Sequence, residues 1–597
     1  MVIIQWPARA PEKRIDPLPF KSRGRGVKWC QREVRLRKHD RYPMNVWVRF
    51  MTCSVVETEI QAMPCWLDSV LPNWIFFCLC CLVAGCGPQV ESHSDQKKYS
   101  QAIQDPEQTL LGREAAALAA RHPEESGFLL LDRGAEAMSW RLLLSDASEK
   151  TIDAQYFLWK NDLAGQVFMH RLLAAARRGI RVRVLLDDSM TEADPLYLAK
   201  FGAHPNIELR LYKPFGPKRK STVLRWLDYA RDLEVLNQRM HNKLFIVDGS
   251  MAIVGGRNIA NEYFEYPGPY VFRCRDLMAV GPIVRQTNSA FDLYWNSDWT
   301  VPIEQVVDRV PDQKEAEAYW KKLAETAQDP ANYSGSDPAV TYDDREVVSA
   351  EMQRLKAELH WGPAKLLVDK VPTLGGQPQV GESLHETGVE LGRMVEQTEH
   401  ELQIETAYLI LLEEGFAALE RASERGVKVT LATNSLASNN HVSSFVGYRK
   451  QRRQLLATGA ELYEMRPDAA SERALFRPQE LDRYKTVFGL HCKTAVFDRK
   501  HVFVGSFNMD PRSTNLNTEM GFLVESPTLA DAVWASIQQD IAPDESWQVI
   551  LQADGRLAWT SLRNGEVIAE PGSEPMATRA RRVEADLLMP LPDDSQL

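Results

Sequence analysis

Alternating apolar and polar positions predict two strands in the first half of the chain, joined by a helix. The stretch Thr151–Tyr156 alternates as a half-buried strand does, and the run Ile180–Asp187 does the same. Between them, a helical stretch runs to Arg178 and Gly179. Strand, helix and strand in this order predict a βαβ unit with two parallel strands.

The second half of the chain repeats this order. A strand is predicted at Leu402–Tyr408, a helix up to Gly426, and a further strand at Val427–Asn434. A duplicated βαβ unit indicates an internal repeat. We therefore expect an α/β protein in which two packed domains contain mixed sheets flanked by helices.

The domain boundaries follow from where these patterns begin and end. We expect the first α/β domain at residues 125–301, a connector at 302–381 and the second domain at 382–545. Within the connector, 316–326 and 346–360 have helical patterns, whereas 329–343 is rich in Asp, Pro, Ser and Gly and is typical of a loop. A short tail with strand-like stretches occupies residues 546–597.

The segment before the first domain has the features of a targeting sequence. Residues 1–62 lack periodicity, and a start of translation at Met44, Met51 or Met63 is as compatible with the sequence as one at Met1. Residues 63–86 hold an apolar core of signal-peptide length that ends in Cys86, and a polar linker follows at 87–124. This segment resembles a bacterial lipoprotein signal, which makes Cys86 the expected lipidation site; an uncleaved anchor and a buried helix are the alternatives.

The charge of the chain changes along its length. The total is −10, of which residues 1–62 contribute +7 and residues 63–86 contribute −1, so the remaining body carries −16. An acidic body is unfavourable for non-specific binding to nucleic acid. Seven of the nine cysteines precede residue 87, and their spacing indicates neither a disulfide framework nor a paired set of metal ligands.

The candidate chemistry lies in one motif that occurs twice. In the first half, His241, Lys243 and Asp248 form an H-x-K-x4-D pattern, and Asn258 follows the histidine by 17 residues. The second half has the same pattern with the same spacing, in His491, Lys493, Asp498 and Asn508. A single copy is a weak signal, but two copies in register within a repeat are a strong one.

These residue types are those that cleavage of a phosphodiester requires. If the motif forms a strand, a histidine and a lysine two residues apart point to the same face. Two lysines and two asparagines can neutralise and bind the phosphate oxygens. One imidazole can attack phosphorus while the other donates a proton to the leaving group, because imidazole titrates near neutral pH. One motif alone lacks half of these groups.

With these motifs the chain resembles the phospholipase D superfamily, and within it the bacterial cardiolipin synthases of the C type. The resemblance covers roughly residues 125–597 and includes Tyr212–Phe215, Leu236–Met240, Arg275–Leu277, Ala364–Asp369 and the tail at Trp547. It implies two α/β domains around a pseudo-twofold axis, no metal or other cofactor, and a phosphohistidine intermediate. It also implies His241 as the nucleophile and His491 as the acid and later the base, although the sequence alone leaves the reverse order open.

The resemblance adds two carboxylates to the candidate site. Asp276 and Glu519 are candidates to bind the second ring nitrogen of each histidine, while Asp248 and Asp498 are either catalytic or structural. Cys492, at the position of Asn242 in the first motif, is expected to pack in the core.

The activity implied is transfer of a phosphatidyl group between phospholipids to give cardiolipin, at a membrane of the bacterial cell envelope. Hydrolysis to phosphatidic acid, a phosphodiesterase acting on nucleic acid, and a non-enzymatic lipid-binding lipoprotein are the alternatives. The chain is expected to bind phospholipid substrates and no nucleic acid.

Overall fold

The structure is a computed structural model that describes residues 97–189, 195–214, 237–329, 345–372, 385–563, 566–571 and 573–590. Residues 91–597 form one compact unit. The predicted extension at 1–62 and the predicted signal segment at 63–86, with Cys86, lie outside the described residues.

The first predicted βαβ unit is confirmed. Strand β2 (Thr151–Tyr156) is followed by helix α4 (Leu163–Arg177) and by β3 (Arg181–Asp187), which pairs with β2 in parallel. Helix α4 begins after Asp162, whose carboxylate accepts a hydrogen bond from the backbone N–H of Gly165 and so satisfies a free donor of the first turn.

Seven further strands complete the first sheet. The order is β10-β1-β8-β6-β5-β2-β3-β4-β9. The additional strands are β1 (Ser126–Leu131), β4 (Ile207–Tyr212), β5 (Leu244–Val247), β6 (Met251–Gly255), β8 (Asp276–Val280), β9 (Thr300–Pro302) and β10 (His360–Gly362). The helices of this half are α2 (Leu110–Ala119), α3 (Gly134–Ala147), α5 (Leu196–Gly202), α8 (Ile283–Trp295), α9 (Ile303–Val306), α10 (Gln313–Gln328) and α11 (Arg345–Glu358).

The second βαβ unit is confirmed as well. It consists of β12 (Glu401–Thr406), α13 (Glu413–Glu424) and β13 (Lys428–Asn434), again with parallel strands. The sheet has the order β11-β18-β17-β16-β12-β13-β14-β19-β20-β21. Its other strands are β11 (Ala364–Val368), β14 (Glu461–Met465), β16 (Lys493–Phe497), β17 (His501–Gly505), β18 (Met520–Glu525), β19 (Ser546–Leu551), β20 (Leu557–Arg563) and β21 (Glu566–Pro571). The helices are α12 (Glu386–Gln397), α14 (Val442–Ala457), α15 (Ala470–Arg473), α16 (Pro478–Tyr484), α17 (Pro511–Asn515), α18 (Pro527–Asp540) and α19 (Arg579–Leu588).

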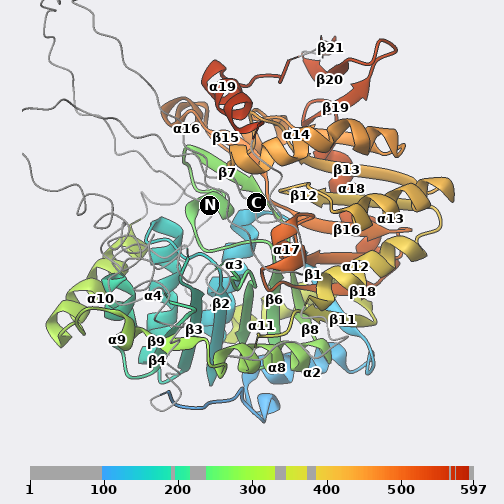
Figure 1. Ribbon diagram of the computed structural model, residues 1–597. Coiled ribbons are helices and arrows are strands. Elements are labelled where there is room, and N and C mark those ends of the chain that lie inside the picture. Colours follow the sequence, from blue (N-terminus) through green and yellow to red (C-terminus); the bar gives the residue numbers. More distant parts are fainter. Residues whose placement is uncertain are drawn as a thin grey trace, which may run out of the picture. The chain divides into compact units, whose positions relative to one another are not determined.

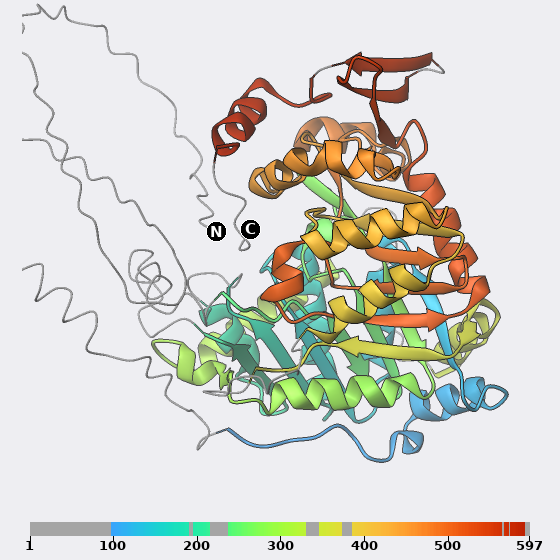
Figure 2. The same ribbon diagram turned by 45° about the vertical axis from the view of Figure 1, so that its right-hand side comes forward.

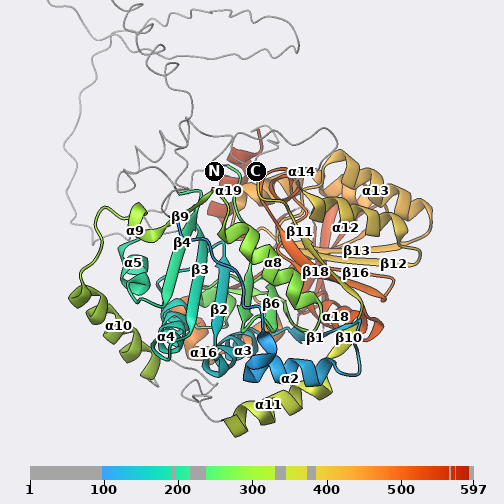
Figure 3. The same ribbon diagram turned by 90° about the horizontal axis from the view of Figure 1, so that it is seen from below.

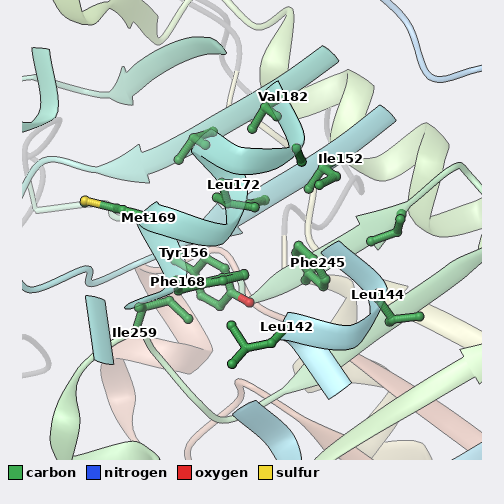
Figure 4. Close-up of a cluster of buried hydrophobic side chains, with 14 of the residues drawn as sticks. Leu142, Leu144, Ile152, Tyr156, Phe168, Met169, Leu172, Val182, Phe245 and Ile259 are labelled. Carbon is green, nitrogen blue, oxygen red and sulfur yellow. The ribbon is translucent and has the colours of Figure 1, made fainter. Parts of the chain in front are cut away.

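Alternating side chains bury both faces of each sheet. In β5, Phe245 and Val247 join the core under α3 and α4, whereas Leu244 and Ile246 point to the opposite face. Figure 4 shows the first of these cores, in which Phe245 lies near Ile152, Phe168 and Leu172. In the second sheet, α12, α13 and α14 cover the corresponding face (Figures 1 and 2).

A shared core joins the two sheets. It contains Val254 and Leu277 from the first sheet and Val504 and Phe522 from the second, together with side chains of α8 and α18. Figure 3 shows the strands of the two sheets on either side of α8. Because each sheet buries one face against the other, the loops at their common edge are held in a fixed relation.

The connector and the tail both contribute strands to these sheets. Within the predicted connector at 302–381, α10 and α11 confirm the two expected helices, and residues 330–344 lie outside the described part. The connector also supplies β10 at one edge of the first sheet and β11 at one edge of the second. In the tail, β19 pairs with β14, so that the second sheet continues through β19, β20 and β21.

Candidate active site

The two motifs lie where segments from the two halves pair with each other. In the first motif, Met240 forms a parallel bridge to Thr518, and the backbone N–H of His241 donates to the carbonyl oxygen of Thr518 at 2.9 Å. In the second, β15 (Val487–Leu490) pairs in parallel with β7 (Tyr270–Arg273), and the N–H of His491 donates to the carbonyl oxygen of Arg273 at 2.7 Å. Each histidine is therefore fixed to the backbone of the other half.

The expectation that each histidine lies within a strand needs correction. His241 and Lys243 occupy the extended segment before β5, and His491 lies between the end of β15 and the start of β16 at Lys493. The backbone N–H groups of the two histidines bond to the other half, so the histidines are not part of the strand pairing within their own sheet. Cys492, between the two motif residues, is fully buried in an apolar cluster, as predicted.

Both motif lysines are buried beside their histidines. The ammonium of Lys243 donates to the carbonyl oxygen of His241 at 2.5 Å. The ammonium of Lys493 donates to the carbonyl oxygen of His491 at 3.0 Å and lies 3.3 and 3.4 Å from its two ring nitrogens. In the described part of the chain, neither lysine forms an ion pair with a carboxylate. Burial lowers the pKa of Lys493 to about 8 and that of Lys243 well below its usual value.

The electrostatics of the histidines show that the two motifs share one environment. Burial lowers the pKa of both imidazoles well below the usual value, and the lysines of both motifs lower it further. A buried group of cations with few anions nearby disfavours additional positive charge and favours binding of an anion. The site therefore has the charge expected of a pocket for a phosphate group.

Glu519 binds His241 across the interface. Its carboxylate oxygens lie 2.9 and 3.0 Å from Nδ1 of His241, and they accept hydrogen bonds from the hydroxyls of Ser506 and Ser513. Burial raises the pKa of Glu519 to about 7. A carboxylate accepts the Nδ1–H, which leaves the lone pair on Nε2 available. The sequence pointed to Glu519 as a partner of a histidine, and the structure places it on the histidine of the other repeat.

Of the other candidate carboxylates, Asp276 does not bind a histidine, and Asp248 and Asp498 have structural contacts. Asp276 accepts from the guanidinium of Arg141 at 2.8 Å and from the backbone N–H of Arg257 at 3.2 Å, and it makes no hydrogen bond to His491. Asp248 accepts three backbone N–H groups of residues 149–151, and Asp498 accepts those of residues 399–401. These two aspartates therefore fix the beginnings of β2 and β12, because orphaned N–H groups at a strand end need acceptors.

The two motif asparagines are buried near the histidines. The amide of Asn258 donates to the hydroxyl of Tyr263 at 3.0 Å, and the Tyr263 ring lies 5.0 Å from the ring of His491. Among the described residues, the side-chain oxygen of Asn508 is buried without a hydrogen-bond partner. Its backbone N–H donates to the hydroxyl of Ser513, which in turn binds Glu519, so Asn508 is held close to the carboxylate on His241.

Several residues of the site escaped sequence reasoning. Tyr263 and Phe272 pack against His491, and Phe157 packs edge-on against His241 at 5.0 Å. Cys274 lies with its sulfur 3.8 Å from Nδ1 of His491. The sequence could have indicated Ser506. It follows His491 by the same number of residues as Gly256 follows His241, and a position at which two repeats differ can mark a difference in function.

A buried arginine pair holds the two halves together beneath the site. Arg273 donates to Asp132 of the first half and to Asp540 of the second, at 2.8 and 2.9 Å. Arg275 binds the same two aspartates and also Glu405. Guanidinium groups bind carboxylates with fixed, directional geometry, so this network sets the register between the halves.

In the described residues, no cluster of three or more His, Cys, Asp or Glu side chains is arranged to hold a metal ion. Over the same part of the chain, no helix has the length and the apolar character to span a bilayer.

Fold and site together define a protein with two phospholipase D-like repeats and one composite phosphodiester site. The chain belongs to the family of cardiolipin synthase, PLD-like domains, whose pattern matches residues 143–295 and 391–541.

Two relatives agree with this assignment. The chain is 36% identical to cardiolipin synthase C of Escherichia coli (strain K12) over 483 residues, which cover 80% of this chain and 97% of that protein. It is 23% identical to cardiolipin synthase B of Shigella flexneri over 408 residues, 67% of this chain and 76% of that protein. Among solved structures, phosphatidylserine synthase of Haemophilus influenzae Rd KW20 matches with a TM-score of 0.47 and 15% identity, covering 73% of this chain and 92% of that one.

Proposed function

We propose that the protein is a membrane-associated phosphatidyltransferase that forms cardiolipin from phosphatidylglycerol and a second phospholipid. The observation that carries the proposal is the composite site, in which two buried His-Lys pairs meet while one carboxylate, Glu519, binds only one of the histidines. The phospholipid substrates are inferred from the activities named for the relatives.

In the first step, Nε2 of His241 attacks the phosphorus of the donor phospholipid. An N–P bond forms, the P–O bond to the headgroup breaks, and the electron pair of that bond remains on the departing oxygen. The negative charge of the bound phosphodiester raises the pKa of His491, so that His491 takes up a proton. His491 then transfers this proton to the departing oxygen, and the headgroup leaves as an alcohol. Lys243, Lys493, Asn258 and Asn508 bind the phosphate oxygens.

In the second step, the headgroup hydroxyl of phosphatidylglycerol replaces the departed alcohol. His491, now neutral, takes the hydroxyl proton, the new P–O bond forms and the N–P bond breaks. The ring of the phosphohistidine carries positive charge, and the carboxylate of Glu519 beside its Nδ1 stabilises that charge. Water in place of the lipid alcohol gives phosphatidic acid, so exclusion of water decides between transfer and hydrolysis.

We further propose that the protein acts at a membrane of the bacterial cell envelope, on its periplasmic face, and that a lipid on Cys86 anchors it there. The support is the apolar segment ending in Cys86. Metabolic labelling with a radioactive fatty acid tests this point, because Cys86→Ala removes the label if Cys86 is the modified residue.

The activity is tested with the full chain in detergent micelles that contain phosphatidylglycerol, with and without phosphatidylethanolamine, and with the lipid products resolved by mass. We expect cardiolipin, and its loss in both His241→Ala and His491→Ala. His501→Ala is the matched control, since His501 lies on β17 of the same half, where its ring lies 3.8 Å from the carboxylate of Glu525.

Other outcomes select the alternatives. Phosphatidic acid with a free headgroup would identify a hydrolase. If no lipid is turned over but plasmid DNA is cleaved, and His241→Ala abolishes that cleavage, the protein is a nuclease. A lipid profile that is unchanged by both histidine substitutions in cells would favour a lipid-binding lipoprotein without catalysis.

A further inference from the structure

The backbone pairing makes Cys274 the structural counterpart of Glu519. His241 donates to the carbonyl oxygen of Thr518, the residue before Glu519, and His491 donates to that of Arg273, the residue before Cys274. The neighbouring strand pairs have the same register. Gly255 pairs with Asp276, two residues after Cys274, and Gly505 pairs with Gly521, two residues after Glu519. The twofold repeat therefore places a thiol behind His491 where it places a carboxylate behind His241.

A second difference accompanies the first. Ser506 hydrogen-bonds Glu519, and its counterpart in the first half is Gly256. A Cβ atom added at Gly256 would lie 2.7 Å from the sulfur of Cys274, closer than atoms pack. Where the second half has Glu519 and Ser506, the first half thus has Cys274 and Gly256. The two differences depend on each other, because the sulfur of Cys274 fits only if position 256 has no side chain.

The sulfur contacts His491 at two points. It lies 3.5 Å from the carbonyl oxygen of His491, to which the thiol donates, and 3.8 Å from Nδ1, to which it offers a lone pair. Burial raises the pKa of the Cys274 thiol, so the group remains neutral. No carboxylate of the described residues forms a hydrogen bond or ion pair with His491.

We propose that Cys274 is a positioning residue for His491, and that its neutral thiol, opposite the carboxylate of Glu519, makes His491 the proton donor and leaves His241 as the nucleophile. This inference rests on the phosphohistidine chemistry of the proposed function. A phosphorylated imidazole must keep Nδ1–H and a positive ring, and a carboxylate stabilises that state while a thiol does not. A proton donor has the opposite requirement, because an imidazolium without an anion beside it releases its proton readily.

The four largest charge effects on His491 all lower its pKa and come from both halves: Lys493, Lys243, His241 and His441. The thiol of Cys274 and the ring of Tyr263 also pack against it. A carboxylate introduced at position 274 would be the first opposing charge at hydrogen-bond distance.

The test compares Cys274→Asp with Cys274→Asn, which has the same size and no charge. We expect the basic limb of the pH profile of kcat, with phosphatidylglycerol as donor, to move up by about 1 to 3 pH units in the aspartate variant. The limb should stay in place in the asparagine variant. An equal position of the limb in wild type and both variants would overturn the proposal.

The leaving group separates a proton donor from a structural residue. Glycerol requires a proton to depart from phosphatidylglycerol, whereas p-nitrophenolate departs without one. We therefore expect the shift with phosphatidylglycerol and none with the p-nitrophenyl ester of phosphatidic acid. The same shift with both esters would contradict the assignment of His491 as the donor.

A measurement without substrate keeps this inference distinct from the proposed function. Nitrogen-15 NMR of labelled histidines, with His491 assigned by the signal lost in His491→Asn, reports its titration directly. If the wild type turns over no phospholipid, the proposed function fails, and the NMR titration alone decides the role of Cys274. A pKa of His491 that is equal in the Asp and Asn variants would refute it.

A smaller change covers the case in which the aspartate variant fails to fold. Cys274→Ala removes both sulfur contacts without adding a charge. We expect kcat to fall roughly 3- to 10-fold with KM unchanged, as loss of a weak hydrogen bond predicts. An unchanged kcat would count against any positioning role.

Discussion

Replacement of Glu519 by glutamine should slow the formation of phosphohistidine without weakening the fold. Glutamine keeps the size of the side chain and one oxygen acceptor for Nδ1 of His241, which lies 2.9 Å from the carboxylate in the wild type. The charge beside the ring is lost. At an effective dielectric constant of about 20, a charge at about 4 Å contributes about 4 kcal/mol. Because each 1.4 kcal/mol or so is tenfold in rate, we expect a decrease of about 10³-fold.

Stability should change in the opposite direction to activity. The pKa of Glu519 is raised to about 7 by burial, so the folded protein takes up a proton that the unfolded chain releases near its ordinary value of 4.5. This contribution to stability is complete below about pH 4.5 and is lost as the pH rises through 7, a difference on the order of 3 kcal/mol. Glutamine carries no charge to desolvate, so at pH 8 the variant should melt no lower than the wild type.

The assay is a rapid-quench single-turnover experiment at pH 8 with phosphatidylglycerol labelled at phosphorus. It measures the rate at which label becomes attached to the protein in a form that is stable to base. Glu464→Gln is the matched control, because Glu464 is also fully buried with a pKa raised to about 7, and it binds Tyr448 and Trp559 away from the histidines. We expect it to lower the melting temperature, because it removes the charge that faces the buried guanidinium of Arg452 at 2.9 Å, and to leave the rate per folded molecule unchanged. A rate in Glu519→Gln within threefold of the wild type would refute the role given to the carboxylate.

Three further predictions concern other parts of the site and its support. Asp248→Asn should lower the free energy of unfolding by about 1–3 kcal/mol, and Asp498→Asn should lower it by less, because Asp248 is fully buried. Both variants should keep the wild-type kcat per folded molecule. Melting curves and active-site titration test these two expectations. Binding of tungstate, a phosphate analogue, should weaken above about pH 8, where Lys493 loses its proton, and calorimetry of Lys493→Met should show no such dependence. Glu405→Gln should leave Arg275 with a buried, partly uncompensated charge and lower the free energy of unfolding by about 3–5 kcal/mol in denaturant titrations, whereas a loss under 1 kcal/mol would show that Asp132 and Asp540 suffice.

Local patterns were sufficient to predict the repeated part of the fold. The β2, α4 and β3 elements and their counterparts β12, α13 and β13 follow from apolar periodicity and from the glycine that ends each helix. The pairs His241 with Lys243 and His491 with Lys493 follow from spacing within one short segment. Such features depend on residues close in the chain, which is why the sequence displays them.

Residue spacing pointed correctly to Glu519 as a partner of a histidine, but it did not show which histidine, and it pointed wrongly to Asp276. Asp276 and Glu519 each follow a motif, yet Asp276 is bound by Arg141 and Arg257, and Glu519 crosses to His241, 278 residues away in the chain. A carboxylate's role depends on the nearest cation or imidazole in space. In a duplicated chain, that neighbour belongs to the other half.

The sequence by itself therefore determined that this protein contains two α/β repeats and two copies of a phosphodiester-cleaving motif. Only the tertiary structure decided that Glu519 binds His241, that a thiol lies behind His491, and that Asp248 and Asp498 fix strand ends. The physical reason is that each histidine is hydrogen-bonded to the backbone of the opposite half, so the chemistry of one motif is set by residues that pack against it from the other.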